Sequence, residues 1–209
     1  MNPPADRRTL RSPRRRAAAA PRGEDAPGLP WDAAAPPREP TALHAARLAA
    51  VCEVLHASGA RRIADLGCGD GVLVRRLLAD PRVERVVALD RSPGALAALE
   101  RLASPQDLRS GRLVLVQGSF TQPHRALAGV DAVAMLETIE HVEPERLSGV
   151  ERQLFGRLCT QTVVVTTPNQ EYNPLFGMAP GQMREPGHRF EWPRARFQAW
   201  VEGWSTSNT

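Results

Sequence analysis

From Thr41 onward the chain alternates between two hydrophobic spacings. Short apolar runs of strand length are separated by stretches in which apolar residues recur every three or four positions, as on one face of a helix. The runs predict five strands, at residues 61–66, 85–90, 112–117, 131–136 and 162–167. Strands that alternate with helices form βαβ units, so we expect an α/β fold with a mostly parallel sheet and helices on both faces.

The helical stretches lie before, between and after these strands. The first begins near Thr41 and ends at Gly59, a residue type that commonly follows a helix. The others are predicted at residues 72–78, at 93–102, at 137–142 with a continuation through 147–158, and at 193–201. In an open sheet of this kind ligands bind beyond the carboxyl ends of the strands, so candidate site residues are sought there.

Residues 1–40 follow neither spacing. They are rich in Pro, Ala and Arg, and we expect them to form a disordered tail in front of one domain at 41–209. The first 25 residues hold seven arginines and three acidic residues, an excess equal to the formal net charge of +4 of the whole chain. Such a tail is either a solvated extension or a contact for nucleic acid, and an organelle transit peptide is a weaker alternative.

Composition narrows the class of protein. With 209 residues and 42% hydrophobic content the chain can bury one sizeable core. No apolar run approaches the roughly 18 residues that a membrane span requires. The three cysteines, Cys52, Cys68 and Cys159, lack the spacing of a zinc knuckle or a disulfide framework. A reducing compartment, the cytoplasm, and no membrane partner are therefore predicted.

A glycine-rich turn follows the first predicted strand. Asp65 precedes Gly67 and Gly69, and glycines let the backbone approach a ligand closely. The second strand ends at Asp90, about twenty residues later, where a carboxylate can accept both ribose hydroxyls of an adenosine. The two features together predict a nucleotide-like ligand at this edge of the sheet.

Carboxylates and imidazoles gather after the fourth strand. If a helix starts near Glu137, then Glu137, Glu140 and His141 lie on one face, close enough for a single divalent cation. His188, further along the chain, is the best candidate for a fourth ligand. Carboxylate oxygens suit a hard cation such as Mg²⁺, and two imidazoles favour Mn²⁺.

These motifs resemble two nested families. The Asp65 to Gly71 turn resembles the Asp/Glu-x-Gly-x-Gly-x-Gly motif of Rossmann-like class I S-adenosylmethionine-dependent methyltransferases. Glu137-x-x-Glu140-His141, the segment 167–173 and the segment 188–194 resemble the Hua-enhancer family of RNA 3′-terminal 2′-O-methyltransferases over about residues 43–202. The resemblance implies methyl transfer from S-adenosylmethionine to the 2′-hydroxyl of an RNA 3′ end with a free 2′,3′-diol.

The resemblance also implies roles for individual residues. The glycine turn would hold the methionine part of the cofactor, and Ser119 would contact the adenine. Glu137, Glu140, His141 and His188 would hold Mg²⁺ or Mn²⁺ against the terminal diol, with His141 as a candidate proton acceptor. Contacts to the terminal nucleotide would come from Asn173 and from Trp192 by stacking, while Phe190 is expected in the core. The RNA would be a small regulatory RNA or, in a bacterium, RNA under repair beside a kinase-phosphatase.

Three departures from the family pattern qualify this interpretation. Gly187 stands where the family has an Asp that could orient His188, and His124-Arg125-Ala126 stands where it has Asp-x-Arg. Class I methyltransferases finish with two more strands, so the domain is expected to be truncated at the C-terminus. Two alternatives therefore stay open: a small-molecule methyltransferase that needs no metal, and an inactive binding remnant.

Overall fold

The computed structural model describes residues 41–158 and 160–206. The predicted disordered tail at 1–40 and Cys159 lie outside the described residues. Five parallel strands form one sheet in the order β3-β2-β1-β4-β5. They are β1 (Arg62–Leu66), β2 (Arg85–Asp90), β3 (Leu113–Gln117), β4 (Ala132–Leu136) and β5 (Thr162–Thr166). All five predicted strands are confirmed, with bounds that differ by at most one residue at either end.

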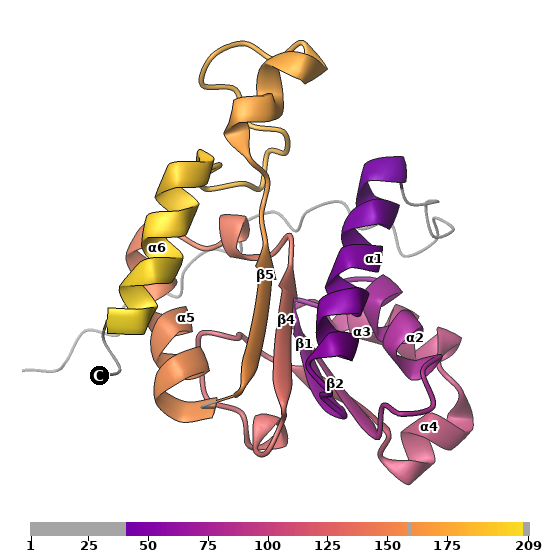
Figure 1. Cartoon of the computed structure of the whole chain (residues 1–209). Coiled ribbons are helices and arrows are strands. Elements are labelled where there is room, and N and C mark those ends of the chain that lie inside the picture. Colours follow the sequence, from indigo (N-terminus) through magenta and orange to yellow (C-terminus); the bar gives the residue numbers. More distant parts are fainter. Residues whose placement is uncertain (1–40, 159, 207–209) are drawn as a thin grey trace, which may run out of the picture. The chain divides into compact units, whose positions relative to one another are not determined.

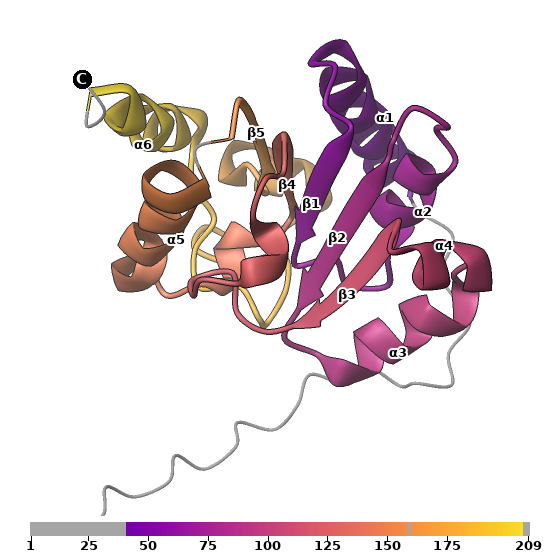
Figure 2. The same ribbon diagram turned by 90° about the horizontal axis from the view of Figure 1, so that it is seen from below.

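Helices cover both faces of this sheet (Figures 1 and 2). One face packs against α1 (Ala42–Ala57), α2 (Val72–Leu78) and α3 (Pro93–Leu102), and the other against α5 (Leu147–Gln153) and α6 (Arg194–Thr206). Successive residues of a strand serve opposite faces. Ile63 belongs to the cluster under α1 to α3, whereas Ala64 belongs to the cluster under α5 and α6. The central strands are thus buried on both faces, which is why they read as continuous apolar runs.

Side-chain caps explain where the helices of the first half begin. Thr41 precedes α1, and its hydroxyl accepts a hydrogen bond from the backbone N–H of His44 at 3.2 Å. Ser92 caps α3 in the same way, and Pro93 occupies the first turn. A short helix that was not predicted, α4 (Pro105–Ser110), starts by the same Ser-Pro pattern. It places two helical segments between β2 and β3 where one was expected.

The predicted helix at 137–142 is wrong, whereas its predicted continuation at 147–158 is helical but forms a separate element. The chain forms a 3-10 turn at Ile139–His141, a second at Pro144–Arg146, then α5 and a π-helical turn at Leu154–Leu158. Glu137 has a φ of +52° and lies outside all of them. A helix cannot run through a residue with this φ, and Pro144 has no N–H to donate within one.

The segment 167–193 joins β5 to α6 and extends beyond the carboxyl end of β5, as the orange and yellow ribbon of Figure 1 shows. It contains a 3-10 helix at Gln170–Phe176, capped by Asn169, whose side chain accepts from the N–H of Glu171 at 2.9 Å. Within the described residues β5 forms an edge of the sheet. No helix in the described part of the chain is both long and apolar enough to cross a membrane.

Candidate active site

The glycine turn after β1 is fixed by contacts on both sides. Gly67 has a φ of +82°, and a Cβ at this position would overlap the side chain of Thr138. Gly69 has a φ of +51° and open space where a Cβ would lie. Its N–H donates to Oδ2 of Asp90 at 2.9 Å, and Oδ1 of Asp90 accepts from the N–H of Ser92 at 2.8 Å. Asp90 therefore ties the turn after β1 to the end of β2, and its predicted contact with a ribose stays a prediction.

Asp65 lies beneath this turn with only 2% of its surface exposed. Burial, with the nearby negative charges of Asp90 and Asp70, raises the pKa of Asp65 to about 7. A carboxyl group in this state is stabilised as an anion by a cationic ligand. The open turn and the acidic groups around it thus fit a ligand that carries positive charge, such as a sulfonium or an ammonium group.

Ser119 lies just beyond β3, half-buried. Its hydroxyl pairs with that of Thr121 at 2.8 Å, and its carbonyl lies 2.9 Å from Nε2 of His124. The ring of His124 packs so closely on Gly118 that a Cβ there would overlap it. The departure from the family pattern at His124 is accommodated by this glycine, and the turn that carries Ser119 is held in place.

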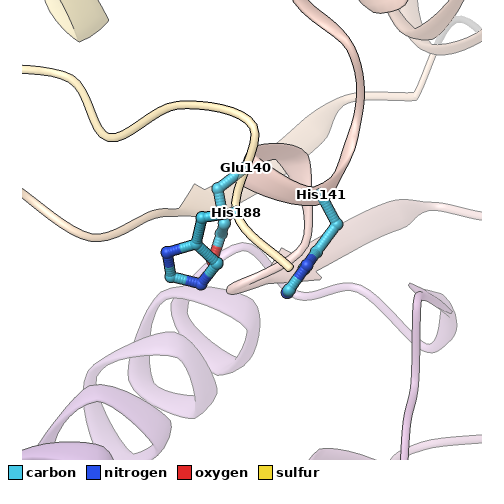
Figure 3. A group of neighbouring side chains, drawn as sticks. All are labelled: Glu140, His141 and His188. Carbon is cyan, nitrogen blue, oxygen red and sulfur yellow. The ribbon is translucent and has the colours of Figure 1, made fainter. Parts of the chain in front are cut away.

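Three of the four predicted metal ligands come together beyond β4. Each of Glu140, His141 and His188 offers one ligand atom, and these atoms all lie within 4.8 Å of one another. Figure 3 shows the glutamate and one histidine on the short turn after β4, and the other histidine on the loop that leads to α6. Two segments far apart in the sequence thus build one group.

Glu140 is the buried centre of this group. One carboxylate oxygen, Oε2, accepts a hydrogen bond from the hydroxyl of Thr167 at 3.0 Å, whereas Oε1 has no hydrogen-bond partner although the side chain is fully buried. Burial, and next the negative charge of Glu137, raises the pKa of Glu140 to about 8. An unpartnered buried carboxylate oxygen is costly unless a cation or a proton satisfies it.

The two imidazoles are oriented alike. Nδ1 of His141 lies 3.2 Å from the carbonyl of Gly187, and Nδ1 of His188 lies 2.6 Å from Oε1 of Glu191. Both partners only accept, so each Nδ1 carries a proton, and in a neutral ring Nε2 then has a lone pair for a metal. Burial lowers the pKa of His141, which favours its neutral form. Two imidazole nitrogens and a carboxylate oxygen can hold a divalent cation, with the oxygen suiting Mg²⁺ and the imidazoles favouring Mn²⁺.

Glu137 is not in the group of three. Its carboxylate accepts a hydrogen bond from the hydroxyl of Thr166 at 3.0 Å and pairs with Arg47 of α1 at 3.1 Å. The expected arrangement rested on a helix that does not form. A role for Glu137 as a fourth ligand stays a prediction and requires its side chain to leave Arg47.

The two predicted substrate residues are both buried. The side chain of Asn173 donates from Nδ2 to Oε2 of Glu191 at 2.6 Å, and its Oδ1 accepts from Nε of Arg184 at 2.7 Å. Trp192 stacks on Phe190 with ring centroids 4.2 Å apart, and 5% of its surface is exposed. The prediction that Phe190 belongs to the core is confirmed. Direct contact of Asn173 or Trp192 with a substrate stays a prediction and needs these side chains to be uncovered.

Sequence reasoning missed the residues that hold the candidate ligands. Thr167 and Glu191 bond directly to them, and Arg47 pairs with Glu137. For Glu191 a signal was available, because it follows His188 by three residues in a motif that had been singled out. Arg47 lies on α1, and only the folded sheet brings this helix to the end of β4.

Comparisons with known proteins relate this chain to methyltransferases. A family model described as a methyltransferase domain matches residues 63–159. A protein named small RNA 2′-O-methyltransferase from Xenopus tropicalis is 36% identical over 148 residues, which are 68% of this chain and 40% of that protein. The protein of the same name from Mus musculus is 34% identical over 149 residues, which are 68% of this chain and 37% of that protein. The chain therefore spans at most 40% of the length of these two relatives.

Solved structures give the same match over the described domain. The methyltransferase domain of a bacterial Hen1, CtHen1-C, is 37% identical, with 77% of this chain and 82% of that chain covered and a TM-score of 0.67. The structure of the small RNA methyltransferase HEN1 is 26% identical, covers 78% of this chain and 21% of that chain, and has a TM-score of 0.71.

Proposed function

This chain belongs to the Hen1 family of small RNA methyltransferases, and on that basis we propose that it methylates the 2′-hydroxyl of the 3′-terminal nucleotide of RNA. The methyl donor is S-adenosylmethionine, and Mg²⁺ or Mn²⁺ assists. The class I methyltransferase fold of the chain provides the donor site. The single observation that carries the metal-assisted step is the group of Glu140, His141 and His188, with its unpartnered carboxylate oxygen.

The donor and acceptor sites adjoin through one contact. Thr138 packs against Gly67 of the glycine turn, and it precedes Glu140 by two residues. A methyl group held near the turn would thus lie close to a hydroxyl held near the cation. A direct transfer needs the reacting atoms about 3–3.5 Å apart. The packing of Thr138 on Gly67 supports this requirement, because it keeps the glycine turn next to the segment that carries Glu140.

On the donor side, Asp65 and the backbone at Gly67 and Gly69 are proposed to hold the charged methionine part of the cofactor. Asp90 keeps lone pairs for the ribose hydroxyls after it has accepted two backbone N–H groups. Ser119, at the end of β3, is proposed to contact the adenine. The burial and charge of Asp65 and the position of Asp90 support these roles, which follow the general rule for ligands at the carboxyl edge of such sheets.

On the acceptor side, Oε1 of Glu140 and the two Nε2 atoms are proposed to hold the cation. Bound there, Mg²⁺ or Mn²⁺ would lower the pKa of the 2′-hydroxyl and fix its oxygen toward the methyl group. The one lone pair of His141 can serve the cation or a proton but not both at once, and we assign it to the cation. Glu137 then remains as the carboxylate that can take the proton or act as a fourth ligand, once released from Arg47.

The choice of RNA end follows from the same chemistry. A free 2′,3′-diol offers two oxygens to a cation, whereas a 3′-phosphate, a deoxyribose or an internal nucleotide does not. Recognition of RNA by its 2′-hydroxyl and by shape needs little reading of sequence. Small regulatory RNA and RNA under repair both meet this requirement when they carry the diol.

The test is the transfer of labelled methyl from S-adenosylmethionine to a short RNA with a 2′,3′-diol end, with Mn²⁺ and with EDTA. The same RNA with a 3′-phosphate and a His188→Ala variant serve as negative controls. His56→Ala, which alters a histidine in the last turn of α1, is the matched control variant. Labelling of the diol RNA that requires Mn²⁺ and His188 supports the proposal. Equal labelling of the diol RNA in EDTA would overturn the metal-assisted step. No labelling by a folded protein that binds the cofactor would favour the small-molecule methyltransferase or the inactive binding remnant.

A further inference from the structure

A chain of hydrogen bonds runs behind His188, away from the side on which its Nε2 is available. Glu191, which is 7% exposed, accepts from Nδ1 of His188 at 2.6 Å through Oε1. The same oxygen accepts from the backbone N–H of Arg184 at 2.7 Å. A buried carboxylate is stable only when its oxygens are well satisfied, and here each oxygen has a short partner.

The second oxygen of this carboxylate is held from the 3-10 helix at Gln170–Phe176. Asn173 donates from Nδ2 to Oε2 of Glu191 at 2.6 Å, and its own Oδ1 accepts from Nε of Arg184 at 2.7 Å. A terminal nitrogen of Arg184 donates to the carbonyl of Asn169 at 2.7 Å. The polar atoms of Asn173 are therefore committed within the protein, which argues against a direct contact with RNA.

We propose that Glu191 is the positioning residue for His188, and that Asn173 and Arg184 act through it by fixing its carboxylate. This proposal rests on the proposed function, since it concerns a histidine assigned to the cation. It gives Asn173 a role in place of the substrate contact expected from the sequence.

The physical reason lies in the tautomer of the imidazole. An anionic acceptor at Nδ1 holds the proton there, aims Nε2 outward and makes that nitrogen a stronger donor to a metal. His141 has only the neutral carbonyl of Gly187 at its Nδ1, at the longer distance of 3.2 Å. The two imidazoles are thus supported unequally, and the loss of Glu191 should affect His188 alone.

The first test needs no metal. In the metal-free protein, nitrogen-detected NMR of the histidine side chains reports which ring nitrogen carries the proton. We expect the His188 ring to be in the Nδ1-protonated form in the parent protein and to become a mixture of the two tautomers in Glu191→Ala, while the His141 ring is unchanged. An unchanged His188 spectrum in a folded Glu191→Ala protein would overturn the proposal.

The second test measures binding of Mn²⁺ alone by electron paramagnetic resonance. Loss of a residue that orients a metal ligand typically weakens metal binding by about 10–100-fold, and we expect Glu191→Ala to fall in that range. Glu145→Ala removes an exposed glutamate near α5 and is the matched control, with no expected change. If the parent protein binds no Mn²⁺, the proposed function fails. If it binds Mn²⁺ and Glu191→Ala binds it equally well, only the positioning role fails.

A paired exchange separates positioning from direct substrate contact. In Glu191→Gln the new amide group must point its N–H₂ at Nδ2 of Asn173, so two donors face each other. In the double variant Glu191→Gln with Asn173→Asp, a donor again faces an acceptor. We expect each single variant to weaken Mn²⁺ binding by roughly tenfold, and the double variant to recover at least about threefold of that loss. If Asn173 contacts RNA instead, Asn173→Asp raises KM for RNA at unchanged Mn²⁺ affinity, and the exchange gives no recovery.

Discussion

In the absence of metal, the free energy of unfolding of Glu140→Gln relative to that of the parent protein should increase as the pH rises. The folded protein holds this carboxyl group with its pKa raised from 4.5 to about 8, because the side chain is buried and Glu137 lies nearby. Such a group contributes stability that is fully present below about pH 4.5 and is lost as the pH rises to about 8, since the folded state retains a proton that the unfolded state has released. At about 1.4 kcal/mol per pH unit, the loss is at most about 5 kcal/mol.

Glu140→Gln is close in shape to the parent residue and does not titrate. Its amide adds an offset to the free energy of unfolding that does not depend on pH, so the informative quantity is the difference between the two proteins at each pH. Asp65, whose pKa is also raised, titrates in both proteins and cancels in this difference. We expect the stability of Glu140→Gln relative to the parent protein to increase steadily from pH 5 to pH 8 and then to level off.

Urea unfolding in EDTA at half-unit steps of pH measures this difference. Addition of Mn²⁺ at 100 times its Kd should reduce the difference at pH 8 by about 2.7 kcal/mol, because the ion stabilises a protein that binds it and only the parent protein retains the carboxylate. If the difference in unfolding free energy stays constant across the pH range, the pKa of Glu140 is not raised in the folded protein, and the reasoning is refuted. Stabilisation of both proteins by Mn²⁺ would refute the role of Glu140 as a ligand.

Two further variants test the donor side of the site. Gly67→Ala places a Cβ against Thr138 at a positive φ, whereas Gly59→Ala has a similar φ but open space. We expect Gly67→Ala to lower the free energy of unfolding by about 1–3 kcal/mol more than Gly59→Ala does. Chemical unfolding measures both variants, and equal losses of stability would contradict the packing of Gly67 against Thr138. Asp90→Asn leaves an amide facing the N–H of Gly69 and removes the charged acceptor for the ribose. Calorimetry should show S-adenosylhomocysteine binding weaker by roughly 10–100-fold. An unchanged affinity would show that Asp90 does not bind the cofactor.

The sequence predicted the sheet well because burial alone determines it. Strands β1, β2 and β4 are covered on both faces, so apart from Asp65 in β1 and the charged residues at strand ends their runs are apolar. The turn residues Gly67 and Gly69 and the carboxylate of Asp90 could be found because they occur at fixed offsets from those strands. Local spacing and the rule for ligands at the carboxyl edge were enough to predict where these residues lie, and their contact with a cofactor stays a prediction.

The acceptor half depends on conformations and contacts that spacing does not encode. The helical periodicity after β4 was real, but Glu137 adopts a φ of +52° and its side chain turns to Arg47 and Thr166. The contact between Glu140 and His188 spans 48 residues; residue type made His188 a candidate and the family resemblance supported it, but local spacing does not predict the contact. The support of His188 by Glu191 was missed because a glutamate three residues away is, in most sequences, an exposed neighbour.

The strand order also constrains how the polypeptide can fold as it is synthesised. β1 lies at the centre of the sheet, yet Arg62, at its start, is hydrogen-bonded to Asp131, 69 residues later, just before β4. A nascent chain can pair β1 with β2, and β2 with β3, early, but one edge of β1 keeps its backbone groups unpaired until β4 has left the ribosome. During that interval an apolar strand edge is open to other chains, which is a state that chaperones protect. Strands β1, β2 and β3, with the glycine turn, are therefore synthesised before β4 and β5 are available to complete the sheet.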